Sequence, residues 1–301
     1  DDLIHDHWRI TKSLGLDRSG ISQITAMAAA PYRELWLGTP SGLARYDGLE
    51  FRWAHLKSSS KTSHSLPLLN VTTLSNISAS SDLYVGVQSQ GVWRYHDQNY
   101  GELESISGPY SRYSTPFTTL AVDHSLYVGG THGLSIIRTD KPSTQERLIA
   151  SDTVFDLARL GSNSEDDLLT CDADGIHRFK PYSQDFKLIF SRTKDDKSCR
   201  GLVSYSMPQK SKISPINGAF ILFEDQLYLL ENNNIYHLET PPINASWRQK
   251  PYLDKVGNLW VPTQDYLYQF DHYTDVRSRG LLGERIEPLA RFDVSNIQTL
   301  Y

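Results

Sequence analysis

Short apolar runs separated by turn-forming residues recur along the whole chain. The clearest example begins at Leu35–Leu37, which suits a β-strand. The small and turn-forming residues Gly38–Gly42 follow, and a second apolar run resumes at Leu43–Tyr46. Gly42 stands where the chain re-enters a strand, a place that often requires a positive φ, which glycine adopts freely. The stretch therefore predicts a β-hairpin.

Weaker copies of this hairpin recur five times, beginning at Leu83, Leu126, Leu168, Leu227 and Leu259. Most keep Gly at the turn, whereas the fifth has Asn234 and the sixth has Tyr266 there. The fifth copy comes late in the chain and the sixth follows it closely, which predicts a long insertion before the fifth. A repeat of roughly 40 to 45 residues with several strands per unit is typical of a β-propeller blade.

The repeats predict an all-β fold, a β-propeller of about seven four-stranded blades that spans residues 1–301 as a single domain. Each blade combines an apolar inner strand, the hairpin and a more polar outer strand. Residues 7–11 suit a strand that completes the last blade and closes the ring. Residues 292–301 resemble the inner strand of another blade, so either both termini build the seventh blade or the parent protein continues after Tyr301.

Composition narrows the classes of partner. The hydrophobic fraction of 39% can bury a large core, and a net charge of −5 gives no basic footprint for nucleic acid. The sequence contains no apolar run of the roughly 18 residues that a membrane-spanning helix needs. The N-terminus does not resemble a signal peptide, which also fits a mature extracytoplasmic segment.

The chain has two cysteines, Cys171 and Cys199. The sequence places Cys199 in a polar stretch; a disulfide that ties this loop to its blade is one interpretation, and two free thiols are the other. Their spacing does not match a zinc site.

The pattern Leu-Trp-Leu-Gly-Thr, then Gly-Leu, then Arg-Tyr-Asp-Gly at residues 35–48, together with its approach at Gly20–Ala26, resembles the two-component regulator propeller repeat. The resemblance implies the extracytoplasmic sensory region of a bacterial histidine kinase, hybrid kinase or diguanylate cyclase. It further implies a periplasmic location, a kinase or cyclase output outside this chain, and signalling through rearrangement of a homodimer. Pro262 replaces the motif glycine in the sixth copy, and the fourth and fifth copies lose Trp and the Gly-Thr pair.

No strong catalytic motif is present: the sequence has no nucleophile elbow, no zinc-protease motif and no phosphate-binding glycine loop. Asp172–Gly175 begins like a calcium loop but lacks the downstream Glu, so a hairpin turn explains it better. We therefore expect no catalytic residues, no metal and no cofactor in this chain.

Ligands of propellers commonly bind at the mouth of the central channel, where loops from successive blades converge. Because equivalent hairpin turns lie at one end of the ring, the repeat predicts a shared ligand-binding face formed by Gln90, His132, Asp174, Asn233 and Gln264. Turn propensity alone also explains these residues. The expected ligand is a small molecule or glycan, or else a protein partner.

Two other functions stay open. A propeller lyase or glycan-acting enzyme would require a second acid or base beside His132 or Asp174. A protein-binding scaffold would instead show a continuous exposed apolar patch on one face.

Overall fold

The strands pair in six separate sheets in the computed structural model. The structure describes residues 23–29, 35–47, 51–53, 57–58, 70–76, 82–96, 102–140, 146–161, 167–191, 198–207, 215–245 and 250–293. Two compact units divide the chain, Asp1–Leu148 and Ile149–Tyr301. The prediction of a single domain stays a prediction.

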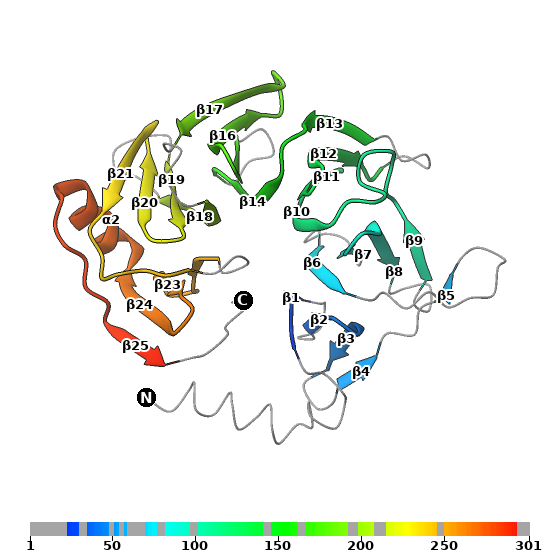
Figure 1. Cartoon of the computed structure of the whole chain (residues 1–301), viewed down its shortest axis with the longest axis horizontal. Coiled ribbons are helices and arrows are strands. Elements are labelled where there is room, and N and C mark those ends of the chain that lie inside the picture. Colours follow the sequence, from blue (N-terminus) through cyan, green and yellow to red (C-terminus); the bar gives the residue numbers. More distant parts are fainter. Residues whose placement is uncertain are drawn as a thin grey trace. The chain divides into compact units, whose positions relative to one another are not determined.

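The first unit holds three sheets, whose strands are labelled in Figure 1. The first sheet is β1 (Ala26–Ala29), β2 (Leu35–Thr39), β3 (Gly42–Tyr46) and β4 (Phe51–Trp53). The second is β6 (Val71–Asn76), β7 (Asp82–Val87), β8 (Gly91–His96) and β9 (Glu102–Ser105), with the short strand β5 (Lys57–Ser58) parallel to β9. The third is β10 (Pro116–Val122), β11 (Ser125–Gly130), β12 (Gly133–Arg138) and β13 (Glu146–Ala150), and the boundary between the units falls within β13.

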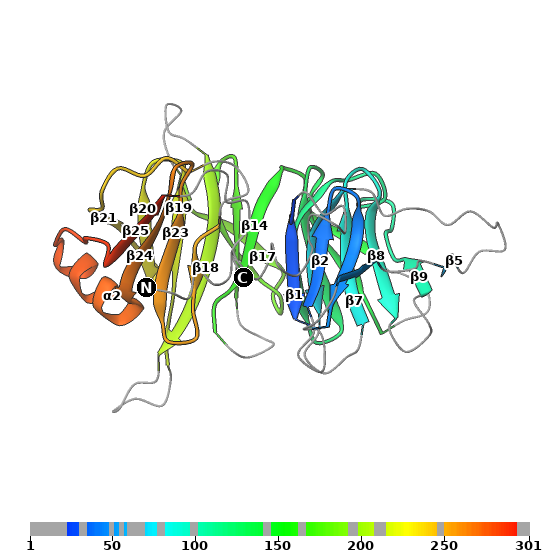
Figure 2. The ribbon, with the colours of Figure 1, turned by 90° about the horizontal axis from the view of Figure 1, so that it is seen from below.

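The second unit also holds three antiparallel sheets. The fourth sheet is β14 (Val154–Arg159), β15 (Leu168–Asp172), β16 (Gly175–Lys180) and β17 (Asp185–Ser191). The fifth is β18 (Cys199–Met207), β19 (Ile216–Phe223), β20 (Leu227–Glu231) and β21 (Asn234–Leu238). The sixth is β22 (Tyr252–Leu253), β23 (Asn258–Pro262), β24 (Tyr266–His272) and β25 (Ala290–Asp293). Helix α2 (Tyr273–Leu282) is inserted between β24 and β25 and lies beside β21 and β24 (Figure 2).

The all-β class is confirmed, but the expectation of about seven blades is wrong: the described residues form six blade sheets. The extra blade was inferred partly from residues 292–301. Phe292 and Asp293 instead end β25, the outer strand of the sixth sheet, because helix α2 delays that strand. The closing strand predicted at residues 7–11 lies outside the described residues.

The first hairpin motif forms as the sequence predicts. Strand β2 pairs with β3 from Leu35 opposite Tyr46 to Thr39 opposite Gly42, and Gly42 has a φ of 138°. Gly91 and Gly175, at the same place in later hairpins, also have positive φ. The recurring glycine is therefore a backbone requirement of the turn.

The fifth hairpin is not where the sequence places it. Leu227–Leu230 is the third strand of its sheet, and Asn233 lies in the turn between the third and fourth strands. The equivalent of the motif is β19 with β20, joined at Glu224–Gln226. The repeat pattern missed this hairpin because β19 lacks the Gly-Thr pair and the turn after it contains no glycine. Since the hairpin begins at β19 rather than at Leu227, the long insertion expected before it does not exist.

In the first unit, neighbouring sheets pack through the motif glycine. A Cβ on Gly38 would lie 2.5 Å from Cγ1 of Val71, the first residue of β6 in the next sheet. Gly86 approaches Pro116, the first residue of β10, in the same way. Buried residues from both sheets, among them Trp36, Val71, Val85 and Tyr95, form the core between the first and second sheets.

The turn before β23 is held by Asp254. Its Oδ1 accepts hydrogen bonds from the backbone N–H of Val256 and Asn258 at 3.0 and 2.8 Å, and its Oδ2 accepts from the Trp260 indole at 2.9 Å. Desolvation raises the pKa of Asp254, but the hydrogen bonds from Trp260 and Asn258 outweigh it and leave the pKa below its ordinary value of 3.8.

Asp254→Asn should lower the free energy of unfolding by about 1 to 2 kcal/mol at neutral pH, since a charged acceptor of several hydrogen bonds is lost. Because the pKa of Asp254 is lower in the folded state than in the unfolded state, its ionised carboxylate stabilises the fold at pH values above the unfolded-state pKa. This stabilisation is lost as the pH falls through the folded-state pKa. The difference between wild type and variant should therefore persist to about pH 4 and shrink below it, as urea denaturation at several pH values would show. A pH-independent difference would contradict this role.

Candidate ligand-binding surface

Gln90 and His132 lie in equivalent turns of the first unit. Gln90 ends the turn between β7 and β8, and His132 lies in the turn between β11 and β12. Both turns join the second and third strands of their sheets. Gln90 is half-buried and His132 is exposed.

The segment Ser107–Thr115, which connects β9 to β10, links these two turns. Gly91 donates its N–H to the Ser114 carbonyl at 3.3 Å, and the Ser89 N–H donates to the Thr115 hydroxyl at 3.2 Å. Thr115 in turn donates its N–H to Oγ1 of Thr131 at 3.1 Å, and that hydroxyl lies 3.1 Å from Nδ1 of His132. Two of the predicted site residues therefore lie in turns that one loop connects by hydrogen bonds.

Further hydrogen bonds hold the same segment in place. The Glu146 carboxylate accepts the N–H groups of Tyr110 and Ser111 at 2.8 and 3.1 Å, and its other oxygen accepts the Ser135 hydroxyl at 2.7 Å. Ser107 is buried and its hydroxyl both accepts from and donates to the backbone of Val92. The backbone of this loop is thus fixed, which favours a preorganised binding surface.

Three exposed side chains project from the anchored segment. Tyr110 is 44% exposed, Tyr113 is 75% exposed, and Arg112 is exposed between them. We call Gln90, Tyr110, Arg112, Tyr113 and His132 the hairpin-end surface. Sequence reasoning missed the central three, although aromatic and cationic residues among Gly, Pro and Ser in a connection between strands were a usable signal.

The remaining predicted residues lie in the second unit, where Asp174 and Gln264 occupy equivalent turns between second and third strands and Asn233 does not. Asp174 is exposed in the turn between β15 and β16, and Gln264 is exposed in the turn between β23 and β24, where its side chain accepts from Asn244 at 3.3 Å. Asn233 lies in a turn between third and fourth strands and accepts a hydrogen bond from Arg178. Arg178 lies toward the end of β16 remote from Asp174, so Asn233 and Asp174 do not meet. That the five residues bind a ligand stays a prediction.

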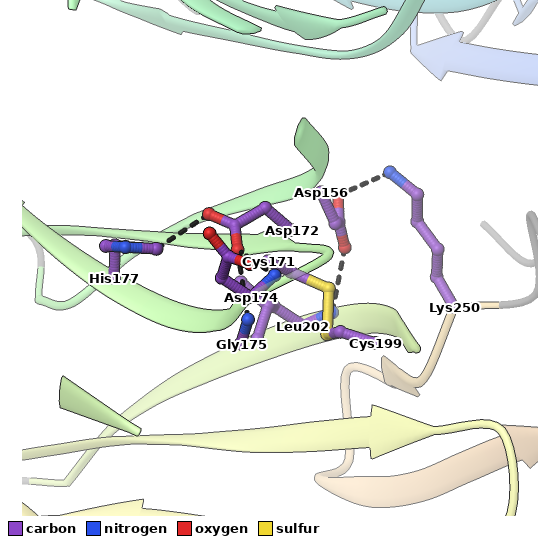
Figure 3. Close-up of a disulfide and its surroundings, with 9 residues drawn as sticks. All are labelled: Asp156, Cys171, Asp172, Asp174, Gly175, His177, Cys199, Leu202 and Lys250. Carbon is purple, nitrogen blue, oxygen red and sulfur yellow. Dashed lines mark hydrogen bonds and ion pairs between the residues drawn. A yellow bond between two sulfur atoms is a disulfide. The ribbon is translucent and has the colours of Figure 1, made fainter. Parts of the chain in front are cut away.

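Asp172, rather than Asp174, organises the fourth hairpin (Figure 3). It is 2% exposed, and its Oδ1 accepts the N–H groups of Asp174 and Gly175 at 3.0 Å each. Thr39 accepts from its own turn in the same way in the first hairpin. Asp172–Gly175 is thus a hairpin turn, and no group of three His, Cys, Asp or Glu that could hold a metal occurs among the described residues.

The acid–base pair that a catalytic interpretation requires does not involve the predicted residues. His132 contacts the Thr131 hydroxyl, whereas imidazole–carboxylate pairs form elsewhere among the described residues, His96 with Asp82 at 2.7 Å and His177 with Asp172 at 2.6 Å. His177 stacks on Phe186 with ring centroids 4.6 Å apart, and its side chain is only 14% exposed. This pair therefore supports the hairpin and presents little surface to a substrate.

The cysteines form a disulfide between neighbouring sheets of the second unit. Cys171 on β15 is joined to Cys199, the first residue of β18, with a Cα–Cα distance of 5.8 Å. Cys171 occupies the motif glycine position and Cys199 the position of Val71, so the disulfide replaces the packing contact seen between the first two sheets. Cys199 belongs to a strand, not to the preceding polar stretch that the sequence suggested.

Buried Asp156, close to the disulfide, links the fourth sheet to the fifth by a hydrogen bond and to Lys250 by an ion pair. Asp156 is 2% exposed, accepts the Leu202 N–H at 2.8 Å through one oxygen and contacts the Lys250 ammonium through the other (Figure 3). Lys250 precedes the sixth sheet, so Asp156 connects all three sheets of the second unit. A Cβ on Gly201 would lie 2.9 Å from Cα of Lys250, which shows how closely this segment approaches β18.

Comparison with known proteins defines the fold. No protein-family model matches the sequence, and no curated protein matches it. The extracellular domain of the putative hybrid two component system BT4673 from B. thetaiotaomicron is structurally similar, with a TM-score of 0.60 and 15% identity over 94% of this chain and 35% of that chain. Virginiamycin B lyase from Staphylococcus aureus is also similar, with a TM-score of 0.61 and 11% identity over 91% of this chain and 85% of that chain.

A third similar structure is PorZ, a surface component of the type-IX secretion system of Porphyromonas gingivalis, with a TM-score of 0.58 and 12% identity over 93% of this chain and 34% of that chain. The chain spans about a third of the length of the BT4673 domain. At these identities the similarity establishes the fold alone: the protein is an all-β propeller, and its described residues form six blade sheets. The extracellular domain of a two component system, a lyase and a surface component have similar folds, so the fold alone does not define the function.

Among the helices of the described ranges, none has the length and apolar character needed to cross a membrane.

Proposed function

We propose that this protein is the ligand-sensing, periplasmic region of a bacterial receptor of the two-component type, related to the two-component regulator propeller repeat, and that it has no catalytic residues. The observation that carries the proposal is the hairpin-end surface, where an anchored loop joins the turns of Gln90 and His132. The structural similarity to the extracellular domain of BT4673 supports it. The disulfide also fits an oxidising compartment.

In this proposal, the kinase or cyclase output lies outside the chain, and binding is transmitted through rearrangement of a homodimer. A ligand can shift such an equilibrium only if it binds one arrangement more tightly than the other. The similarity to virginiamycin B lyase keeps the fold compatible with an enzyme. We favour a sensor because His132, the histidine of the predicted face, is paired with a hydroxyl rather than with an acid or base of the described residues.

Thermal unfolding of the protein against a panel of glycans, amino acids and small anions tests the proposal. A ligand of the folded state raises the apparent stability by mass action, by about 2.7 kcal/mol at a hundred times its Kd. We expect a shift that Gln90→Ala and His132→Ala each abolish. His124→Ala is the matched control, because His124 is an exposed histidine in the turn between β10 and β11, at the opposite end of the same sheet.

A ligand-induced shift that His124→Ala reduces as much as His132→Ala would place the site elsewhere. Turnover of any compound in the panel, lost in His132→Ala, would favour the enzyme.

A further inference from the structure

Arg112 differs from the other arginines that the structure describes in the first unit. Those others all have a partner: Arg45 lies over the Trp36 ring, Arg52 pairs with Asp47, Arg94 with Glu104, Arg138 with Asp140, and Arg147 also interacts. The Arg112 side chain forms no ion pair or hydrogen bond with any described residue. An exposed guanidinium on a fixed backbone is a ready donor to an anion.

Glu146, the acidic residue that contacts this loop, does not form an ion pair with Arg112. Both oxygens of Glu146 are engaged, one by the N–H groups of Tyr110 and Ser111 and the other by the Ser135 hydroxyl. His132, in the turn between β11 and β12, contacts Thr131 through Nδ1, which leaves its Nε2 facing away from that bond. The ionisable side chains that the hairpin-end surface offers to a ligand are therefore Arg112, His132 and the tyrosines.

Tyr110 and Tyr113 supply an apolar component beside this donor set. With 44% and 75% of their surfaces exposed, both rings leave large flat areas open. Tyrosine contributes contact area at a low entropic cost because it has few rotatable bonds. The anchored backbone further lowers the entropy that the loop loses when a ligand binds.

We propose that the hairpin-end surface binds an anionic ligand built on a ring, with its carboxylate or sulfate on Arg112 and the ring face against Tyr113. This rests on the proposed function, since it names the ligand class of the same surface. The net charge of −5 disfavours anions over the molecule as a whole, so an unpaired arginine at this surface confers selectivity. Sugar acids and aromatic acids share the required chemistry.

Pairs of probes that differ only in charge test the inference. Galacturonate is compared with galactose, and 4-hydroxybenzoate with 4-hydroxybenzyl alcohol, by calorimetry and thermal unfolding. We expect the acid of at least one pair to bind at least tenfold more tightly than its neutral partner, and the pair that responds identifies the source of the ring. The preference should shrink at high salt, as an exposed charge interaction does.

Arg112→Gln should remove the tenfold preference for the acid, and Tyr113→Ala should weaken both members of the pair. Arg52→Gln, at another exposed arginine of the same unit, is the control and should leave the preference intact. All three positions are exposed, so the variants should keep the unfolding temperature of the wild type.

The inference is overturned if neither acid binds, if neutral partners bind as tightly, or if Arg112→Gln keeps the preference. Should Gln90→Ala and His132→Ala still abolish binding of a neutral compound, the proposed function stands while the anionic ligand fails. If no compound in the wider panel binds either, both fail.

Discussion

Arg277→Met should lower the free energy of unfolding by about 3 to 5 kcal/mol, because it leaves a buried carboxylate without its counter-ion. Glu231 is 4% exposed and contacts the guanidinium of Arg277 through both oxygens. The same carboxylate accepts the Tyr205 hydroxyl at 2.8 Å. Burial, with a further contribution from Glu231, raises the pKa of Tyr205, so the tyrosine stays a donor at all working pH values.

The measurement is urea denaturation followed by circular dichroism, with Arg279→Met as the matched control. Arg279 lies on the same helix, in its last turn, and is exposed. The control should change stability by less than about 0.5 kcal/mol, as exposed substitutions usually do. Combining Arg277→Met with Glu231→Gln should restore part of the loss, since the unpaired charge is then removed. Equal effects of the two arginine variants would refute the role of this ion pair.

Helix α2, which carries Arg277, was not predicted from the hydrophobic repeats. Its signals are local: His272 caps the first turn, Asp275 lies in that turn, and Gly283 ends the helix with a φ of 72°. They lie between two strands of one blade, so a search for repeated hairpins skips them. Gly280 then lets the helix approach β21 so closely that a Cβ would lie 2.1 Å from Leu238.

The blade hairpins could be predicted because their physics is local. A strand, a turn with glycine at positive φ and a second strand follow each other directly, and four of the six motif copies formed around such a glycine. The number of sheets was missed because it depends on pairing between distant segments, such as β25 with β24 across a helix. Residues 219–223 were recognised as a strand candidate, but their pairing with Leu227–Leu230 as the fifth hairpin was missed because the turn between them contains no glycine.

The candidate site was predictable only in part. The turns of Gln90 and His132 follow from the repeat, but their connection depends on the loop that contains Tyr110 and Tyr113, which has no counterpart in the motif. Asn233 was placed on the wrong turn because the fifth copy was shifted by one strand. A hairpin assigned to the wrong pair of strands therefore also assigns the wrong residues to the candidate site.

The disulfide provides the second large expected effect. Replacing both Cys171 and Cys199 by Ala should lower the free energy of unfolding by about 3 kcal/mol, because a cross-link over 28 residues restricts the unfolded chain. Both cysteines are fully buried between the fourth and fifth sheets, so the lost packing adds to this effect. Denaturation in urea, with and without a phosphine reductant, measures it.

Adding the reductant separates the contribution of the covalent cross-link to stability from the contribution of side-chain packing. Wild type unfolded in its presence loses the constraint on the unfolded chain, so its stability should fall toward that of the double variant. The variant itself should not respond to reductant. Because Gly38 and Val71 occupy the equivalent positions between the first two sheets without a covalent bond, the fold itself does not need the disulfide. We therefore expect the variant to keep a wild-type circular dichroism spectrum, and loss of the strand signal would show that the bond is required for the fourth and fifth sheets to assemble.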